Sequence, residues 1–513
     1  MSDLSRGLLV IDFGSQTTML IARRIRELGV YSEIWPCTDP RLSQAPDALG
    51  YILSGGPASV GGEGAPRLAS QLLDAGRPVL GICYGMQLIG AHFGATVGAA
   101  PVREFGRTMV HRIGSSALLT DLPAESVVWM SHGDAVSDLP PTLRPTARSA
   151  EGTLAALEVD GRPIFAVQFH PEVTHTAWGA QILRRFAFDA CGAQGDWSME
   201  DLAERKVAEL RAKVGDSKVI LGLSGGVDST VVAALLSRAV HRHTVCILVD
   251  NGLMRHEEAA QVAALFRSRF DVELRVVDAT AEFLAALAGV TDPEQKRKAI
   301  GKTFIDVFEA AAKDVPGVEW LAQGTLYPDV IESVSAKGPA AVIKSHHNVG
   351  GLPERLPFKL IEPLRELFKD EVRALGRALG VPEEILGRHP FPGPGLAVRI
   401  LGEVTPERLR IVREADRIFI DTLREDGLYD RAWQAFAALL PVRTVGVMGD
   451  ARTYDQVIAL RAVTSTDGMT ADRAELPFAF LGRVADRIVN TVRGVNRVVY
   501  DLTSKPPGTI EWE

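Results

Sequence analysis

Two places in the sequence join a short apolar run to a glycine-containing turn and then to a stretch with helical character. At the first, Pro78-Val79-Leu80 is followed by Gly81-Ile82-Cys83-Tyr84-Gly85 and then by Met86 to His92. At the second, Val219 to Leu223 is followed by Ser224-Gly225-Gly226-Val227-Asp228-Ser229. A strand that turns sharply into a helix is the repeating unit of parallel α/β sheets. Both parts of the chain are therefore expected to contain such a sheet.

The alternation of strands and helices continues around both turns. Strand-like runs lie at 7–11, 51–53, 245–249 and 274–277, and helical stretches at 17–28, 199–214, 230–239 and 257–270. A chain of 513 residues is too long for one ordinary core. We predict two consecutive α/β domains with mainly parallel sheets, at residues 1–194 and 195–390.

The composition changes after Phe391-Pro392-Gly393-Pro394-Gly395-Leu396, whose prolines and glycines disfavour a helix. Thr405 followed by Pro406 has the pattern of an N-cap and a first helical residue. Strand-like runs follow at 442–447, 456–463 and 496–502. We predict a small α+β domain at 391–513, and we expect it to supply the contact of a homodimer.

Composition disfavours several classes of partner. The net charge of −8, with both signs interspersed, gives no basic footprint for nucleic acid. No apolar run approaches the roughly 20 residues that a membrane helix needs, and Met1 to Arg6 has no apolar signal region. The four cysteines have unrelated spacings, and one is a candidate for chemistry that needs a free thiol, so we expect a cytoplasmic location.

Cys83 is the candidate nucleophile of the first domain. The sharp turn would hold its sulfur above the sheet, and the flanking glycines allow a backbone approach that a Cβ would block. Residues 168–172, Gln-Phe-His-Pro-Glu, supply an imidazole that can take the thiol proton and a carboxylate that can orient the ring. A buried, inert cysteine is the alternative for Cys83 taken alone, and it is our interpretation of Cys37, Cys191 and Cys246.

The order of these residues resembles class I glutamine amidotransferases. Ser54-Gly55-Gly56-Pro57 fits the oxyanion loop of that family. The resemblance implies that Cys83, His170 and Glu172 form a catalytic triad and that backbone N–H groups stabilise the developing negative charge. The residues that it assigns to the oxyanion and glutamine site are Gly55, Gly56, Tyr84 and Gln87.

The segment Ser224 to Ser229 lies where a strand becomes a helix, the position at which α/β folds bind phosphate. Its glycines let successive N–H groups face an anion, its hydroxyls add hydrogen bonds, and the helix dipole favours negative charge. It is not a Walker A loop, because the Gly-Lys-Ser/Thr ending is absent. A short glycine turn that opens a helix is often only structural. The whole six-residue segment is therefore stronger evidence for a phosphate site than its glycines alone.

The same segment resembles the phosphate loop of ATP pyrophosphatases, which split ATP into AMP and pyrophosphate while they adenylylate an acceptor. The resemblance implies an ATP site at Ser224, Gly225, Gly226, Val227, Asp228 and Ser229, with Mg²⁺ at Asp228. It also assigns Val249 and Gly324, at later strand ends, to the nucleotide edge of this site. Taken singly, these two residues are almost as well explained by ordinary strand-end loops.

Residues 325–359 are rich in Gly, Lys and His and lack helical periodicity. We expect a mobile loop that closes over charged phosphates. Its sequence is similar to the lid of the GMP synthase family, which implies Lys344, His346 and His347 as lid residues. Lys344 is the preferred anion contact. The alternative for the two histidines is a surface position, and no third ligand accompanies them for a metal.

The segment 505–513, Lys-Pro-Pro-Gly-Thr-Ile-Glu-Trp-Glu, sets a cation beside two prolines and a carboxylate a few residues on. It closely resembles the C-terminus of the GMP synthase family, which contacts XMP. The XMP-binding residues that the resemblance implies are Gly393, Gly395, Lys505, Ile510 and Glu511. Arg297 is a further candidate for the XMP phosphate, although a basic triplet such as 296–298 is usually a solvated surface.

This resemblance extends over essentially the whole chain and implies a ligase that converts XMP, ATP, L-glutamine and water into GMP, AMP, pyrophosphate and glutamate. Mg²⁺ with ATP is the expected cofactor, with no permanently bound organic cofactor. Two other classes remain as alternatives, and the sequence weighs against both. Another ATP pyrophosphatase, such as a tRNA thiolase or an NAD synthase, would need a basic RNA surface or a different glutaminase. A non-catalytic glutamine sensor would be expected to lack some of the reactive residues.

Overall fold

The computed structural model describes residues 3–329, 358–448, 451–465 and 470–513. The chain divides into two compact units, Met1–Ser198 and Met199–Glu513, called unit 1 and unit 2 below. The three-domain division expected from the sequence stays a prediction. In the described ranges, no helix combines the length and the apolar character that crossing a membrane requires.

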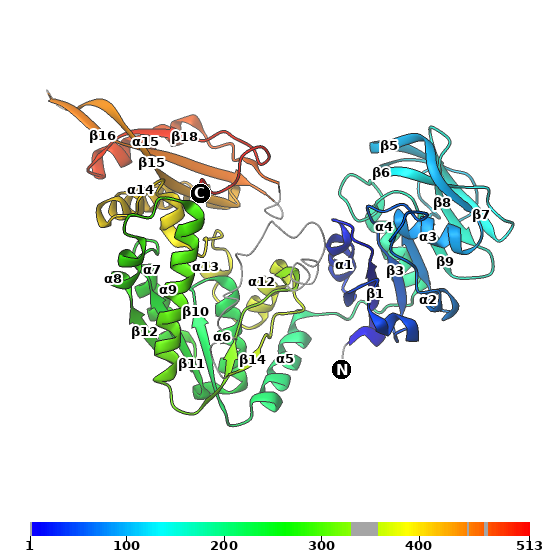
Figure 1. Ribbon diagram of the computed structural model, residues 1–513, viewed down its shortest axis with the longest axis horizontal. Coiled ribbons are helices and arrows are strands. Elements are labelled where there is room, and N and C mark those ends of the chain that lie inside the picture. Colours follow the sequence, from blue (N-terminus) through cyan, green and yellow to red (C-terminus); the bar gives the residue numbers. More distant parts are fainter. Residues whose placement is uncertain (1–2, 330–357, 449–450, 466–469) are drawn as a thin grey trace. The chain divides into compact units, whose positions relative to one another are not determined.

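Unit 1 is built on a nine-stranded sheet with the order β2-β1-β3-β4-β9-β8-β7-β5-β6 (Figure 1). Its parallel strands are β1 (Leu8–Asp12), β2 (Ser32–Pro36), β3 (Gly50–Leu53), β4 (Val79–Ile82) and β9 (Ile164–Val167). Strands β1, β3, β4 and β9 are almost wholly buried, as expected for parallel strands covered on both faces. The α/β pattern predicted for this part is confirmed.

Four antiparallel strands extend this sheet, and the sequence analysis did not anticipate them. They are β5 (Thr96–Arg112), β6 (Glu125–Ser137), β7 (Leu143–Ser149) and β8 (Leu154–Val159). The helices of unit 1 are α1 (Thr18–Glu27), α2 (Gln71–Asp74), α3 (Tyr84–His92) and α4 (Gly179–Arg185). The sheet therefore changes from a parallel to an antiparallel arrangement at the pair β9–β8.

Unit 2 contains a five-stranded sheet in the order β12-β11-β10-β13-β14, and every pairing in it is parallel. Its strands are β10 (Lys218–Leu223), β11 (Thr244–Asp250), β12 (Glu273–Asp278), β13 (Val318–Ala322) and β14 (Lys359–Ile361). The accompanying helices are α5 (Met199–Val214), α6 (Val227–Ala239), α7 (Glu258–Arg269), α8 (Thr280–Leu287), α9 (Pro293–Lys313), α12 (Lys369–Ala378) and α13 (Glu383–Leu386). The second α/β pattern is thus also confirmed.

The C-terminal part of unit 2 adds a second, four-stranded sheet. It consists of β15 (Gln434–Met448), β16 (Ala451–Thr464), β17 (Asp472–Arg473) and β18 (Val495–Tyr500), with α14 (Pro406–Glu425) and α15 (Phe478–Thr491). Thr405 caps α14 as predicted, because its hydroxyl accepts a hydrogen bond from the Arg408 amide at 3.3 Å. Buried side chains of α14 and β15 share one hydrophobic core with those of β10 and β11, so this part is anchored to the parallel sheet.

The carboxyl ends of parallel strands lie at one edge of each sheet, where α/β folds bind their ligands. In unit 1 the turns after β4 and β9 lie at this edge, and in unit 2 the turns after β10, β11 and β13 do. These turns carry most of the candidate site residues of the two parallel sheets.

Candidate active sites

The turn after β4 holds Cys83 in the left-handed region, with φ 53° and ψ −104°. Glycines on both sides make this turn possible. A Cβ added to Gly85 would lie 2.4 Å from the Leu53 carbonyl oxygen, and one added to Gly81 would lie 2.7 Å from the Gly85 backbone. A non-glycine residue with positive φ is uncommon and is often found at functional sites. The geometry is that of the strained nucleophile turn expected from the sequence.

The other two triad candidates lie beside Cys83 because β4 and β9 are neighbouring parallel strands. Ile82 pairs with Val167, and the Cys83 amide donates to the Val167 carbonyl at 2.8 Å. His170 follows three residues later, and its Nδ1 lies 2.8 Å from Glu172 Oε1. Both side chains are buried. The structure therefore brings the cysteine, the imidazole and the carboxylate together, as the sequence analysis expected.

The ionisation of His170 is governed by its two neighbours. Burial alone would lower the pKa of this histidine from its usual 6.5. Hydrogen bonds to Cys83 and Glu172, and the negative charges of both groups, outweigh the burial and raise the pKa to about 10. At neutral pH the arrangement therefore favours the imidazolium form of His170, which lies between Cys83 and Glu172.

Two of the oxyanion candidates border the thiol directly. A Cβ on Gly55 would lie 3.3 Å from His170 Cε1 and 3.6 Å from Cys83 Cβ, so the Gly55 backbone faces the gap between them. Tyr84 is the first residue of α3, where backbone N–H groups lack partners within the helix. Gly56 packs against a neighbouring backbone carbonyl, which a Cβ would approach to 2.7 Å. Their role in stabilising an oxyanion stays a prediction.

Gln87 and strand β6 close another side of the same site. Gln87 Nε2 donates to the Asp134 carbonyl at 3.1 Å. The Ser131 carbonyl lies 3.8 Å from Cys83 Sγ. The sequence analysis missed this contribution of β6, although the polar run Ser131-His132-Gly133-Asp134 inside a strand is a visible signal.

A buried pair supports this part of β6. His132 Nε2 lies 3.1 Å from Glu104 Oε2, and both side chains are almost fully buried. His132 Nδ1 lies 3.0 Å from the Asp134 carbonyl. Because this carbonyl also accepts from Gln87, the pair links β5 and β6 to the helix that begins at the nucleophile.

In unit 2, the loop after β10 has the form of a phosphate-binding turn. Gly225 has φ +74°, and a Cβ there would lie 2.8 Å from Val262 Cγ2. Gly226 is the N-cap of α6, and no side chain caps this helix. The hydroxyls of Ser224 and Ser229 lie 3.1 Å apart. Uncapped N–H groups at a helix start are suited to an anion.

Asp228, in the first turn of α6, lies against a lysine that the sequence analysis did not select. Lys369 Nζ donates to both carboxylate oxygens, at 2.7 and 2.6 Å. Among the described residues, no group of three His, Cys, Asp or Glu side chains could hold a metal by itself. Mg²⁺ is commonly bound by one or two carboxylates together with substrate phosphates and water, and a single Asp228 beside a phosphate loop fits this manner of binding.

The two further ATP candidates occupy the same strand edge. Val249 is buried in β11. Gly324 follows β13, and a Cβ on it would lie 3.2 Å from Asp228 Cβ. Gly324 thus packs directly on the phosphate loop, which supports its selection. The lid candidates Lys344, His346 and His347 lie outside the described residues.

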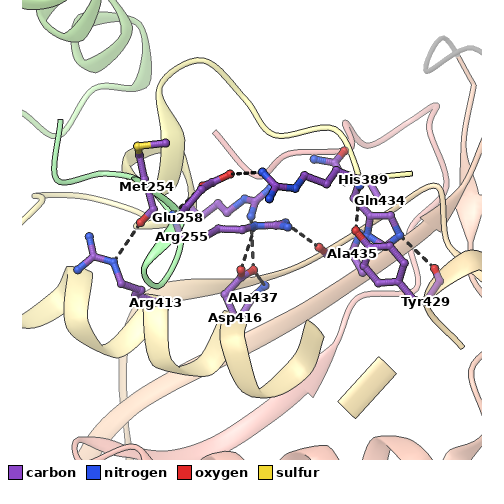
Figure 2. A network of polar contacts seen from close by, with 12 residues as sticks. Met254, Arg255, Glu258, His389, Arg413, Asp416, Tyr429, Gln434, Ala435 and Ala437 are labelled. Carbon is purple, nitrogen blue, oxygen red and sulfur yellow. Dashed lines mark hydrogen bonds and ion pairs between the residues drawn. The ribbon is translucent and has the colours of Figure 1, made fainter. Parts of the chain in front are cut away.

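Figure 2 shows how the turn after β11 is tied to α14. Arg255 Nε lies 3.2 Å from Asp416 Oδ2. Arg413 Nε donates to the Met254 carbonyl at 3.0 Å, and Glu258 faces a further arginine. These contacts hold the end of β11 against the C-terminal part of unit 2.

The same network holds the segment before the Pro-Gly-Pro-Gly turn. The rings of His389 and Tyr429 stack with centroids 3.8 Å apart, and His389 Nδ1 accepts a hydrogen bond from the Ala435 amide at 3.2 Å (Figure 2). Burial lowers the pKa of His389 to about 4, so the ring stays neutral and can accept this bond. The segment is therefore fixed to the start of β15.

The glycines that follow were predicted to contact XMP. Gly395 has φ +64°, and a Cβ there would lie 2.5 Å from the Leu253 carbonyl. This places the turn against the end of β11. A Cβ on Gly393 would meet nothing within 4 Å, so its backbone is open to a ligand.

The tail folds back onto this turn. Glu511 accepts hydrogen bonds from Gln434 Nε2 at 2.6 Å and from Arg399 Nη2 at 3.1 Å. Ile510 is buried, and the backbone of Lys505 pairs with that of Ala471. The carboxylate predicted to meet XMP therefore already has two protein donors.

Arg297 lies at the same place, as the sequence analysis proposed. Its Nη2 donates to the main-chain oxygen of Glu513 at 2.5 Å. The neighbouring Lys296 is fully buried, where its ammonium contacts the Glu513 carboxylate and donates to the Ile400 carbonyl at 2.6 Å. The basic triplet is thus not simply a solvated surface. The structure brings Arg297 and the tail together, and their contact with XMP stays a prediction.

Three family descriptions match consecutive parts of the chain: glutamine amidotransferase class-I at residues 9–190, NAD synthase at 199–302 and GMP synthase C terminal domain at 421–512. GMP synthase [glutamine-hydrolyzing] of Phenylobacterium zucineum (strain HLK1) is 57% identical over 512 residues, which cover 98% of each chain. The relative of that name in Rhodopseudomonas palustris (strain HaA2) is 57% identical over 513 residues, covering 99% of this chain and 95% of its own. The chain belongs to the glutamine-hydrolysing GMP synthase family.

Membership of the GMP synthase family decides between the classes that the sequence left open. The match to NAD synthase spans only residues 199–302, whereas the GMP synthase relatives match on both sides of this range. A further relative, from Zymomonas mobilis subsp. mobilis (strain ATCC 31821 / ZM4 / CP4), is 56% identical over 518 residues and covers 99% of this chain and 98% of its own. The part shared with NAD synthase is therefore a domain within a GMP synthase architecture.

Proposed function

We propose that this chain aminates XMP to GMP, with glutamine as the nitrogen source and ATP as the activating nucleotide. Similarity over 98% of its length to a glutamine-hydrolysing GMP synthase is the observation that carries this proposal. The chain is then a carbon–nitrogen ligase of purine nucleotide biosynthesis. Per turnover, XMP, ATP, glutamine and water yield GMP, AMP, pyrophosphate and glutamate.

Glutamine hydrolysis would take place at Cys83. The thiolate attacks the side-chain carbonyl of glutamine, and the oxyanion is stabilised by backbone N–H groups near Gly56 and Tyr84. The His170 imidazolium gives its proton to the leaving nitrogen, which departs as ammonia and leaves a thioester. Neutral His170 then takes a proton from water as the hydroxide attacks, and the thiolate leaves with glutamate released. Glu172 keeps the ring oriented, which the 2.8 Å contact supports.

ATP would bind with its phosphates on Ser224 to Ser229, where the open start of α6 faces an anion. When bound at Asp228 with ATP, Mg²⁺ would neutralise phosphate charge. Lys369 can exchange its contact with Asp228 for a contact with a phosphate oxygen. Val249 and Gly324 would border the nucleotide, and Lys344 would meet the phosphates from the lid, with His346 and His347 beside it. No permanently bound organic cofactor is required by this chemistry.

XMP would bind where the tail meets the Pro-Gly-Pro-Gly turn. Arg297 and Lys505 provide cations for its phosphate. Gly393 and Gly395 allow a close backbone approach, and Ile510 and Glu511 would contact the base. The contact between Arg297 and Glu513, and that between Glu511 and its two donors, support this location. An oxygen of bound XMP then attacks the α-phosphorus of ATP, and pyrophosphate leaves. Ammonia attacks the carbon that carries this oxygen, and the oxygen leaves as part of AMP.

A homodimer and a cytoplasmic location complete the proposal. The exposed apolar side chains of the C-terminal part favour a second copy as the partner; they include Val442, Val445, Val447, Tyr454 and Phe478. All four cysteines are free, which suits a reducing compartment. Neither nucleic acid nor a membrane is required as a partner.

The decisive experiment follows nucleotide products by chromatography when the full chain is incubated with XMP, ATP, Mg²⁺ and glutamine. A parallel reaction replaces glutamine by ammonium. GMP and AMP from both nitrogen sources are expected. AMP without GMP would support ATP pyrophosphatase activity but exclude XMP as the acceptor. A chain without either product would be better described as a non-catalytic glutamine sensor.

A further inference from the structure

Gln168 lies next to the nucleophile for a reason of strand register. It is the first residue after β9, and Cys83 is the first residue after β4. Because Ile82 pairs with Val167 in this parallel pair, the next residue of each strand also lies side by side. The backbone of Gln168 is fixed there, since its amide donates to the Ala155 carbonyl at 2.9 Å.

The side chain of Gln168 reaches the sulfur. Its Nε2 lies 3.6 Å from Cys83 Sγ, and the residue is 0% exposed. In the described structure its Oε1 is buried with no hydrogen-bond partner. Burying an amide with one end unsatisfied is unfavourable, and such groups are rare in folded proteins. Packing alone therefore does not explain why a glutamine occupies this position.

The groups around the sulfur differ in which protonation state they favour. The Ser131 carbonyl, 3.8 Å away, can only accept a hydrogen bond and therefore suits the thiol. An amide N–H can only donate, and its bond to a thiolate is charge-assisted and stronger than its bond to a neutral thiol. The His170 imidazolium, which is backed by Glu172, also favours the thiolate.

We propose that Gln168 is a further catalytic residue of the glutaminase site, whose amide N–H binds the Cys83 thiolate and keeps the sulfur ionised and aimed at glutamine. This proposal rests on the proposed function, in which the Cys83 thiolate attacks the glutamine amide. His170 supplies one donor, which must turn away to protonate the leaving ammonia. Gln168 supplies a second hydrogen-bond donor. Its amide is neutral, does not give up its proton and stays in place throughout the cycle.

The test compares Gln168→Met, which has similar volume but no N–H, with Gln168→Glu, which keeps the shape and adds a negative charge. The alkylation rate of the full chain by iodoacetamide is measured against pH, and the rate of Cys83→Ala is subtracted to remove the other cysteines. Loss of one hydrogen bond to a charged group predicts an alkylation rate about tenfold to a hundredfold lower at neutral pH for Gln168→Met. Gln168→Glu is expected to be slower still.

The steady-state signature should match the alkylation. Glutamine-dependent kcat should fall by a similar factor in Gln168→Met, the KM for glutamine should stay within about twofold, and ammonium-dependent GMP formation should be unchanged. Gln71→Met, the same substitution at an exposed position in α2, is the matched control and should leave all three quantities unaltered.

Two outcomes would overturn the proposal. One is an alkylation profile of Gln168→Met that coincides with wild type. The other is a lower glutaminase rate with an unchanged alkylation profile, because Gln168 would then act only through packing. The alkylation assay needs neither XMP nor ATP. A wild-type chain that makes no GMP from ammonium would therefore refute the proposed function without affecting this result.

Discussion

The two strand–turn–helix junctions of this chain place the left-handed backbone on different kinds of residue. After β4 it falls on Cys83, with φ 53°. After β10 it falls on Gly225, with φ +74°, where a glycine adopts it without strain. The first turn is enclosed by Leu53, Gly55 and β6, whereas the second leads into an uncapped helix.

The difference follows from the chemical group that each turn has to present. Covalent catalysis needs a side chain at the apex, and an L-residue with positive φ there is strained by roughly 1–2 kcal/mol, which the surrounding packing must offset. Phosphate binding needs backbone N–H groups, so the apex can be a glycine. One local topology thus gives a rigid thiol site in unit 1 and an open anion site in unit 2.

The strongest test of this division removes the side chain at the first apex. Cys83→Ala should lower glutamine-dependent GMP formation by at least about 10⁴-fold, because no other group can form the thioester. Ammonium-dependent formation should persist. Both rates are read from nucleotide chromatography, with Cys37→Ala, outside the site, as the matched control. Loss of both activities would show that the two junctions do not work separately.

The second junction is tested by the side chain that follows its glycines. Asp228→Ala should reduce GMP formation from either nitrogen source by about a hundredfold to a thousandfold, since Lys369 loses its partner and phosphate charge is less well neutralised. Release of AMP measures the effect. Asp216→Ala, at an exposed position before β10, should be silent. A defect confined to the glutamine-dependent reaction would contradict the assignment of this loop to ATP.

The role of glycine at the second apex can be separated from that of its neighbour. Gly225→Ala should lower AMP formation by about tenfold or more, since positive φ is unfavourable for alanine and the new methyl would meet Val262 at 2.8 Å. Gly226→Ala has an ordinary φ of −77° and a contact of 3.3 Å to Ser224, so it should cost less. Equal losses of AMP formation in the two variants would show that the positive φ of Gly225 does not matter, and backbone strain would then not distinguish the two junctions.

The tail, residues 505–513, is expected to act in nucleotide binding rather than in glutamine hydrolysis. Lys505→Ala should raise the KM for XMP by about tenfold, the loss expected for one charge-assisted hydrogen bond. The KM for ATP should stay within about twofold. Initial rates with ammonium isolate this effect from the thiol site. An unchanged KM for XMP would mean that Lys505 does not bind the substrate.

The smallest effect concerns pH. The pKa of His170 is raised to about 10, so the imidazolium is present at neutral pH and is lost as pH rises through that value. Its contribution to folding stability has the same sign, since a raised histidine pKa stabilises the fold below about pH 6.5 and ceases to do so near pH 10. Glutamine-dependent kcat should therefore change little between pH 7 and about pH 9. A rate that falls as the pH rises past about 6.5 would show that Cys83 and Glu172 do not raise the pKa of His170.

Local patterns, together with the family resemblance, selected the candidate residues that the structure places close together. The triad and the phosphate loop depend on residues that closely follow strand ends, and the cap at Thr405 depends on residues at a helix start; in both places local geometry limits the possible residues. In the structure, the proximity of Cys83 and His170 is explained by one further rule, that the carboxyl ends of parallel strands lie at one edge.

Contacts between distant segments could not be predicted in the same way. Lys369 meets Asp228 across 141 residues, and no local pattern marks either as the partner of the other. The antiparallel strands β5 to β8 could not be predicted from an alternation of strands and helices, because no helix separates them within the described residues 96–159. The shared core of α14 and β11 likewise depends on packing between segments far apart in the chain.

The position of β9 has a consequence for synthesis of the chain. In the finished sheet β9 lies between β4 and β8, although β4 is made more than eighty residues earlier in a chain numbered from Met1. Until Ile164–Val167 has left the ribosome, β4 has an unpaired edge, and neither Gln168 nor His170 can reach the sulfur. A nascent chain therefore carries an inert cysteine, and the ability to hydrolyse glutamine arises only when the last strand of that sheet is inserted.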